Sequence, residues 1–90
     1  MIMNNQRRKA LKDAMKQMEE AAALLTAAKE AIESIKEEEE EAYDNLPDSF
    51  QEGAQGDQMQ ENINAMDEVI DNLDTQASDI EEYIQSLENL

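Results

Sequence analysis

Apolar residues recur at alternating steps of three and four through both halves of the chain. In the first half the stripe consists of Leu11, Ala14, Met18, Ala21, Leu25, Ala28, Ile32, Ile35, Glu39, Ala42 and Leu46, with Glu39 the one polar member. In the second half it consists of Met59, Ile63, Met66, Ile70, Leu73, Ala77, Ile80, Ile84 and Leu87. A period of 3.5 residues sustained over four heptads is typical of a coiled-coil seam. The pattern therefore predicts two long helices, each with one seam.

The single proline and both glycines lie between the two stripes. Pro47 disfavours a helical conformation at Leu46, so the first helix is expected to span about 5–45. Asp57, with Gln60 three residues later, matches a capping box and predicts a second helix over about 58–89. The connection 46–57 holds one short turn, in which Phe50 is expected to fold over the end of the seam. The corner is expected to be built from Tyr43, Leu46, Pro47 and Phe50.

Two apolar stripes joined by a short connection predict an all-α fold, an antiparallel two-helix coiled-coil hairpin forming a single domain over 1–90. A fold about Glu52 places Leu87 opposite Gln17. The start of the first helix then extends beyond the second, and this overhang holds four of the seven cations: Arg7, Arg8, Lys9 and Lys12. Within a single hairpin the overhang is expected to contact nothing.

The middle of the first helix is apolar on nearly all sides, because residues 21–28 include seven apolar side chains. In the second helix, Val69 and Tyr83 lie beside the seam and outside it. One partner helix cannot cover these positions, and an isolated two-helix hairpin is a marginal fold. A homodimer that forms a four-helix bundle is therefore expected, with a monomeric hairpin carrying scattered surface alanines as the alternative.

Charge divides the chain unevenly. It has 23 acidic and seven basic residues, a net charge of −16, and after Lys36 there are 18 acidic residues and no basic one. Basic residues near the start of the first helix and glutamates near its end both oppose the helix dipole. One explanation is that the basic start of the first helix complements the acidic end of the second, or the acidic face of a second copy. Seven cations leave most of the 23 acidic residues uncompensated, and these either keep the protein soluble or bind a positively charged partner.

Candidate chemistry is sparse. The chain has no Cys and no His, so neither disulfides nor the usual zinc ligands are available. Paired carboxylates such as Asp67 and Asp71 lie on a helix predicted to be solvated, without a pocket to shift their pKa values. We expect no enzyme activity, no cofactor and no metal. Without an apolar run long enough for a signal peptide or a membrane span, the expected location is the cytoplasm, with no membrane partner.

The functional hypothesis is that an acidic face binds a basic protein surface, in its most specific form by occupying a site for nucleic acid. Direct binding of nucleic acid is disfavoured by the net charge. The alternative is a structural coiled coil whose activity is to oligomerise. The residues expected to contact the partner are Glu37, Glu38, Glu40, Glu41, Asp67, Glu68, Asp71, Asp74, Glu81 and Glu82.

The segment 41–51, EAYDNLPDSFQ, followed by GDQMQ at 56–60 and IDNL at 70–73, resembles a family of small uncharacterised acidic proteins. These are helical-hairpin proteins of Firmicutes-type bacteria and of their phages and prophages, and the resemblance extends over nearly the whole chain. It implies no established activity. It does imply an accessory role directed at proteins, such as inhibition of a host or defence factor in the bacterial cytoplasm, and a structured corner around Tyr43 and Pro47.

Overall fold

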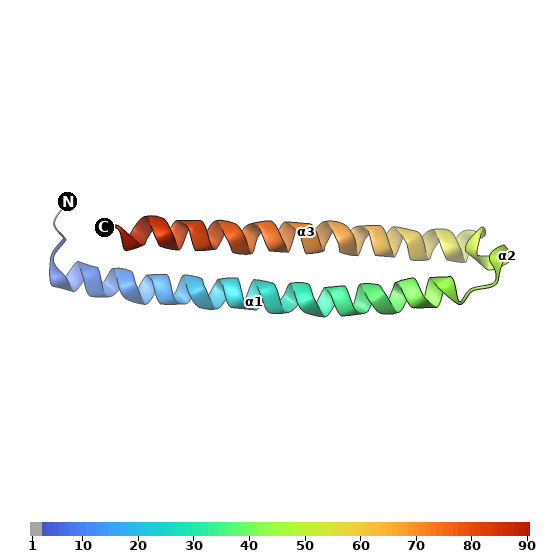
Figure 1. The fold of residues 1–90 in the computed structure, drawn as a ribbon, viewed down its shortest axis with the longest axis horizontal. Helices are drawn as coiled ribbons and strands as arrows, with labels where there is room; N and C mark the ends of the chain where they lie inside the picture. The colour runs from blue at the N-terminus through green and yellow to red at the C-terminus, as the bar shows by residue number, and fades with distance from the viewer. Residues whose placement is uncertain (1–2) are drawn as a thin grey trace.

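A computed structural model describes residues 3–90 as two long helices lying side by side and joined at one end of a rod (Figure 1). Helix α1 spans Asn5–Asp44, the short α2 spans Asp48–Gln51, and α3 spans Ala54–Glu88. The described chain contains no strand. The rod measures 68 × 16 × 13 Å between Cα atoms, and the start of α1 and the end of α3 lie at the end opposite α2. The predicted all-α architecture with one long helix pair is confirmed.

Local contacts determine where α1 begins and ends. Asn4 caps the helix, since its side-chain oxygen accepts a hydrogen bond from the Arg7 N–H at 2.8 Å. At the other end, the Asn45 N–H donates to the Glu41 carbonyl at 3.1 Å, and Pro47 prevents a further helical turn. The helix ends within one residue of its predicted boundary.

The corner differs from its prediction in two respects. Helix α3 begins at Ala54, four residues early, with Gly53 at its N-cap. The Asp57 N–H therefore donates to the Gly53 carbonyl inside the helix, and the predicted capping box at Asp57 is wrong. Phe50 is also not folded over the seam, because its side chain is 54% exposed. The short turn itself is present as α2.

Backbone contact between α2 and α3 explains the early start of α3. Gly56 is buried against Gln51, and a Cβ atom built at Gly56 would lie 2.0 Å from the Gln51 carbonyl oxygen. Only glycine allows the two segments to approach this closely. The Gln51 side-chain amide donates to the Tyr43 carbonyl at 2.9 Å, so α2 is attached to the end of α1 as well.

The seam of α3 agrees with the sequence pattern at every position. All nine predicted residues are buried or half-buried, and Ile63, Ala77 and Ile84 are each no more than 8% exposed. Their alternation of three and four residues keeps one stripe of α3 against α1 over its whole length.

The seam of α1 agrees only at every second position. Leu11, Met18, Leu25, Ile32, Glu39 and Leu46 are half-buried as predicted. At the other five positions, the residue that faces α3 is the one directly after the predicted residue in the sequence. These residues are Met15, Ala22, Lys29, Lys36 and Tyr43. The predicted residues Ala14, Ala21, Ala28, Ile35 and Ala42 are all exposed, Ile35 by 54%.

Side-chain length accounts for this rotation of α1. Lys29 and Lys36 lay their aliphatic stems along the seam and carry their ammonium groups out to carboxylates of α3. The rotation also brings the larger Met15 and Tyr43 into the seam in place of alanines. A pattern based on apolar character alone excludes lysine from such positions, which is why the prediction was wrong there.

The register of the hairpin is close to the predicted one, since Lys36 pairs with Asp67 and Lys29 with Asp74. The overhang is shorter than expected. The Arg8 guanidinium donates to the Leu90 carbonyl at 3.2 Å, and Leu11 is half-buried. The expectation that the start of α1 contacts nothing is therefore wrong for these residues. Within residues 3–90, no helix is both long and apolar enough to cross a membrane.

Candidate interface for a basic partner

The two long sides of the hairpin differ in chemistry. On one side, which we call the polar face, Lys29 and Lys36 emerge from the seam toward carboxylates of both helices. On the other side, the apolar face, Ile35 of α1 and Val69 of α3 line a shared hollow with Ile32, Ala65 and Met66. Residues seven apart in each helix repeat on the same side, so both faces extend along the rod.

A ladder of ion pairs crosses the polar face. The Lys29 ammonium lies 3.0 Å from the Asp74 carboxylate, and one heptad along the chain Lys36 pairs with Asp67. The hydrogen bond to Asp74 raises the pKa of Lys29, and the hydrogen bond to Asp67 raises that of Lys36. Each lysine also has a glutamate four residues later within 4.0 Å, Glu33 or Glu40. Two of the predicted partner-binding carboxylates, Asp67 and Asp74, are therefore occupied within the chain.

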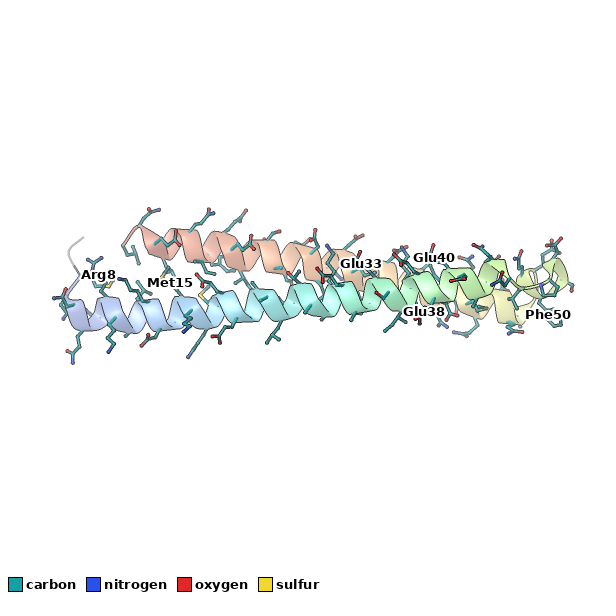
Figure 2. All side chains as sticks on the ribbon, turned by 60° about the horizontal axis from the view of Figure 1, so that its bottom comes forward. Arg8, Met15, Glu33, Glu38, Glu40 and Phe50 are labelled. Carbon is teal, nitrogen blue, oxygen red and sulfur yellow. The ribbon has the colours of Figure 1, made fainter. Side chains whose placement is uncertain are left out.

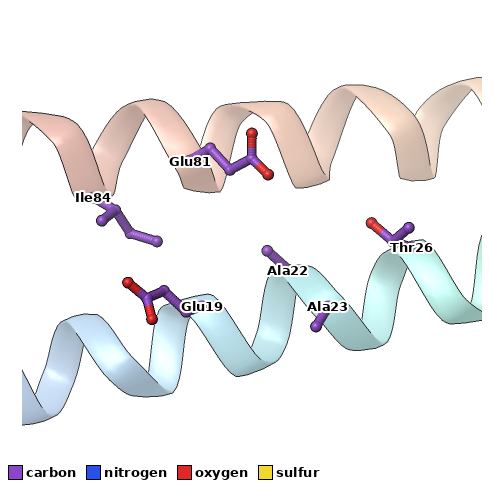
Figure 3. Close-up of a pocket in the computed structure, with 6 residues that line it drawn as sticks. All are labelled: Glu19, Ala22, Ala23, Thr26, Glu81 and Ile84. Atoms are coloured by element: carbon purple, nitrogen blue, oxygen red, sulfur yellow. The ribbon is translucent and has the colours of Figure 1, made fainter.

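The next heptad toward the end of α3 lacks an ion pair of this kind. There the pattern places Ala22 in α1 and Glu81 in α3, so an acidic residue is present without its lysine. In place of the ion pair lies an open hollow of about 350 Å³, lined by Glu19, Ala22, Ala23, Thr26, Glu81 and Ile84. Figure 3 shows Glu19 and the small Ala22 side chain on α1, with Glu81 across from them on α3. Among residues 3–90, neither glutamate forms an ion pair.

This arrangement suits the side chain of a lysine or arginine from another molecule. The alkyl stem would lie on the methyl group of Ala22 and on Ile84, and the charged head would reach Glu19 and Glu81. Inside the chain, Lys29 and Lys36 make the contact that corresponds to the one with Glu81. Thr26 occupies the position that corresponds to Glu33 and Glu40, and Glu19, three residues before Ala22, supplies the carboxylate of α1 instead. The hollow therefore repeats the α3 side of the ladder and is open to an external cation.

The end of the rod that carries α2 is the most acidic part of the molecule. Residues 37–61 contain ten acidic residues and no basic one. The five consecutive glutamates at 37–41 do not form one face, because successive helical residues point about 100° apart. Glu39 faces the seam and accepts a hydrogen bond from the Asn62 amide at 3.4 Å. Glu40 and Glu38 leave α1 in different directions (Figure 2).

The predicted partner-binding residues are thus distributed around the rod. Glu40 belongs to the polar face beside Lys36, and Glu38 lies next to Ile35 near the apolar face. Glu37, Glu41, Glu68, Asp71 and Glu82 are exposed. Of the ten, only Glu81 lines the hollow.

The sequence analysis missed Glu19 and the hollow, although a signal was present. Asp67, Asp74 and Glu81 recur every seven residues, and so do Lys29 and Lys36. Matching the two series in the antiparallel register leaves Glu81 without a lysine.

No group of three or more Asp or Glu side chains within residues 3–90 is arranged to hold a metal ion. Comparisons of the chain with protein-family models, with curated proteins and with solved structures found no match.

Proposed function

We propose that this chain is a non-enzymatic, acidic protein-binding module that docks on a basic protein through its polar face. The observation that carries the proposal is the interrupted ladder, in which Glu19 and Glu81 flank a hollow where the preceding repeats hold a lysine. A lysine or arginine of the partner takes that place. The carboxylates of residues 37–61 add long-range attraction that raises the rate of association.

The proposal includes a homodimer that forms a four-helix bundle. Charge density supports a dimer as the binding form. One chain carries −16 along a 68 Å rod, so two side by side carry −32, and a DNA duplex of that length has roughly 40 phosphates at one per 1.7 Å. A dimer approaches the charge density of a nucleic acid, and a monomer has less than half of it.

The partner we propose is a protein whose basic surface normally binds nucleic acid, so that the module acts as an inhibitor by competition. The phage or prophage origin suggested by the resemblance is consistent with a host or defence protein in the bacterial cytoplasm as the target. In this role the module requires neither a cofactor nor direct contact with nucleic acid.

The test places a lysine of the chain itself in the hollow. Ala22→Lys supplies the missing lysine beside Glu81, and Ala27→Lys adds the same charge at an exposed position outside the hollow. Binding of a fluorescent octa-arginine peptide is measured by anisotropy at low salt and at 0.3 M salt. We expect Ala22→Lys to weaken binding about tenfold, the loss of one charged contact worth about 1.4 kcal/mol, with little effect of Ala27→Lys. Equal effects of the two substitutions would show that the hollow does not bind the peptide.

Identification of the partner uses capture from bacterial lysate on the immobilised protein. We expect recovery of a nucleic-acid-binding protein that is released as salt rises and that duplex DNA displaces. The Ala22→Lys protein should recover less of it than the Ala27→Lys protein.

The second candidate function is a structural module that oligomerises, and the exposed apolar face favours it. Replacement of Glu37, Glu38, Glu40 and Glu41 by Lys separates the two functions. Electrostatic binding of the basic partner should be lost, whereas a module that only oligomerises should assemble unchanged.

A further inference from the structure

The apolar face is the largest feature that the proposed docking surface leaves unused. On α1 it consists of Ala14, Ala21, Leu24, Ala28, Ala31, Ile35 and Ala42, and on α3 of Ala65, Val69 and Tyr83, all of them exposed. Leu24 is 71% exposed, Tyr83 57% and Val69 43%. Large apolar side chains gathered on one side of a small protein indicate an interaction surface.

We propose that a second copy of this chain covers the apolar face, with the two rods antiparallel. This inference rests on the dimer included in the proposed function and specifies its interface and orientation. The two-fold axis passes through the face at Ala28 of α1 and Gln76 of α3. Each α1 then lies against the α1 of the other copy, and each α3 against the other α3.

The spacing of side chains along α1 matches this symmetry. About an axis at Ala28, Ala21 of one copy faces Ile35 of the other, and Ala14 faces Ala42. A small residue thus lies opposite the large one, and alanines elsewhere allow the two helices to approach closely. By the same symmetry Leu24 falls level with Ile32 of the second copy, next to the exposed Ala31.

The same axis also suits α3. About Gln76, Val69 of one copy faces Tyr83 of the other, so these two exposed residues of the apolar face cover each other. Gln76 lies one residue from the position opposite Ala28 in the hairpin register given by the Lys29–Asp74 pair. A single two-fold axis can therefore satisfy both helices, as an isologous interface requires.

Charge decides between antiparallel and parallel rods. The half of the rod near α2, residues 33–70, holds 13 acidic residues and one lysine, whereas the remaining residues hold ten acidic and six basic ones. A parallel dimer would place the two strongly acidic halves together. An antiparallel dimer places each beside the half that contains the basic start of α1, which lowers the repulsion.

The area is sufficient for a stable dimer. From Ala14 to Ala42 the face extends about 42 Å at 1.5 Å per residue, and the rod is 16 Å wide. Their product is roughly 700 Å² per copy, or about 1,400 Å² in total, within the range of specific interfaces. The hollow between α1 and α3 on this face is lined by apolar side chains alone, whereas the hollow on the polar face is lined by Glu19 and Glu81, so the two faces suit different occupants.

Single-cysteine variants of the full chain test the inference, because the natural sequence has no Cys. An equimolar mixture of Ala14→Cys and Ala42→Cys proteins is oxidised and the disulfide-linked dimer is quantified. In an antiparallel dimer these residues meet across the interface. In a parallel dimer they lie about 42 Å apart, too far for a disulfide. Ala27→Cys, on the outer side of α1, reports random collisions, and sedimentation gives the mass of the unmodified protein.

We expect a mass twice the 10.2 kDa of one chain and at least tenfold more linked product from the mixture than from Ala27→Cys. In a parallel dimer, Ala21 of one copy would instead lie near Tyr83 of the other. A disulfide-linked dimer from a mixture of the Ala21→Cys and Tyr83→Cys proteins would therefore refute the antiparallel arrangement, although the protein would still be a dimer. A dimer linked by neither mixture would exclude the apolar face as its interface. A monomer at every concentration would refute the dimer itself, with peptide binding in the hollow still to be judged by its own test.

Discussion

Replacement of Gly56 by alanine distinguishes the structure most sharply from expectations based on sequence. Gly56 lies in the first turn of α3, and alanine is the better helix former by about 1 kcal/mol. Helix propensity alone therefore predicts that Gly56→Ala stabilises the protein. The structure predicts the opposite, because the new Cβ would lie 2.0 Å from the Gln51 carbonyl oxygen and 2.5 Å from its carbonyl carbon.

The size of the effect follows from what would have to move. Both contacts are with backbone atoms, so no side-chain rotation can relieve them and α2 must shift away from α3. Overpacking of this kind costs about 1–3 kcal/mol. Because the contacts are with backbone atoms, the cost is expected at the upper end of this range, about 3 kcal/mol. The gain in helix propensity of about 1 kcal/mol leaves a net loss of about 2 kcal/mol, which for a chain of this length lowers the melting temperature by roughly 8–16 °C.

Thermal and urea unfolding followed by far-ultraviolet circular dichroism measure this effect at a fixed protein concentration. Gly53→Ala is the matched control, because its Cβ would lie 3.4 Å from the nearest atom, the Ser49 carbonyl oxygen. We expect the control to change stability by less than about 1 kcal/mol. If Gly56→Ala stabilised the protein as its helix propensity predicts, the close packing of α2 on α3 would be refuted.

Three further predictions concern the helix pair. Asn4→Ala should destabilise the protein by about 1 kcal/mol in urea unfolding through loss of the cap on α1, and Asn4→Ser should retain most of the stability. Ile63→Ala should cost about 2–3 kcal/mol because Ile63 is only 7% exposed, whereas Leu24→Ala should cost little at concentrations too low for a dimer. Lys29 and Lys36 have pKa values raised above their ordinary 10.5 by Asp74 and Asp67, so their contribution to stability is complete below about pH 10.5 and is lost as the pH rises through the raised values. The Asp67→Asn, Asp74→Asn double variant should therefore lose less stability than the natural protein between pH 10 and 12, and parallel declines would contradict this role.

Much of the architecture could be predicted from the sequence. The uninterrupted stripe from Met59 to Leu87 predicted the buried side of α3 correctly at all nine positions, because the other apolar residues of α3, such as Val69 and Tyr83, are too few to form a second continuous stripe. Pro47 and the two glycines located the connection, and a fold about Glu52 predicted a register close to the observed one.

The rotation of α1 could not be predicted, since its sequence offers two candidate seams that share every second residue. One continues through Ala28 and Ile35, the other through Lys29 and Lys36. Apolar character favours the first. The second is the one observed, because Asp74 and Asp67 of α3 lie within reach of the lysines once the helices pair. That outcome depends on residues some 30 to 45 positions away in the chain, which no local pattern contains.

The candidate site depends on the same rotation of α1 against α3. Acidity, the absence of Cys and His, and two long helices are determined by the sequence itself. Only the paired helices bring Glu81 across from Glu19 and Ala22 and leave a hollow between them. The same rotation moves the alanine stripe and Ile35 out of the seam and onto an exposed face. Composition and periodicity thus determined which helices form, whereas the packing of one helix on the other decided which side chains each face presents.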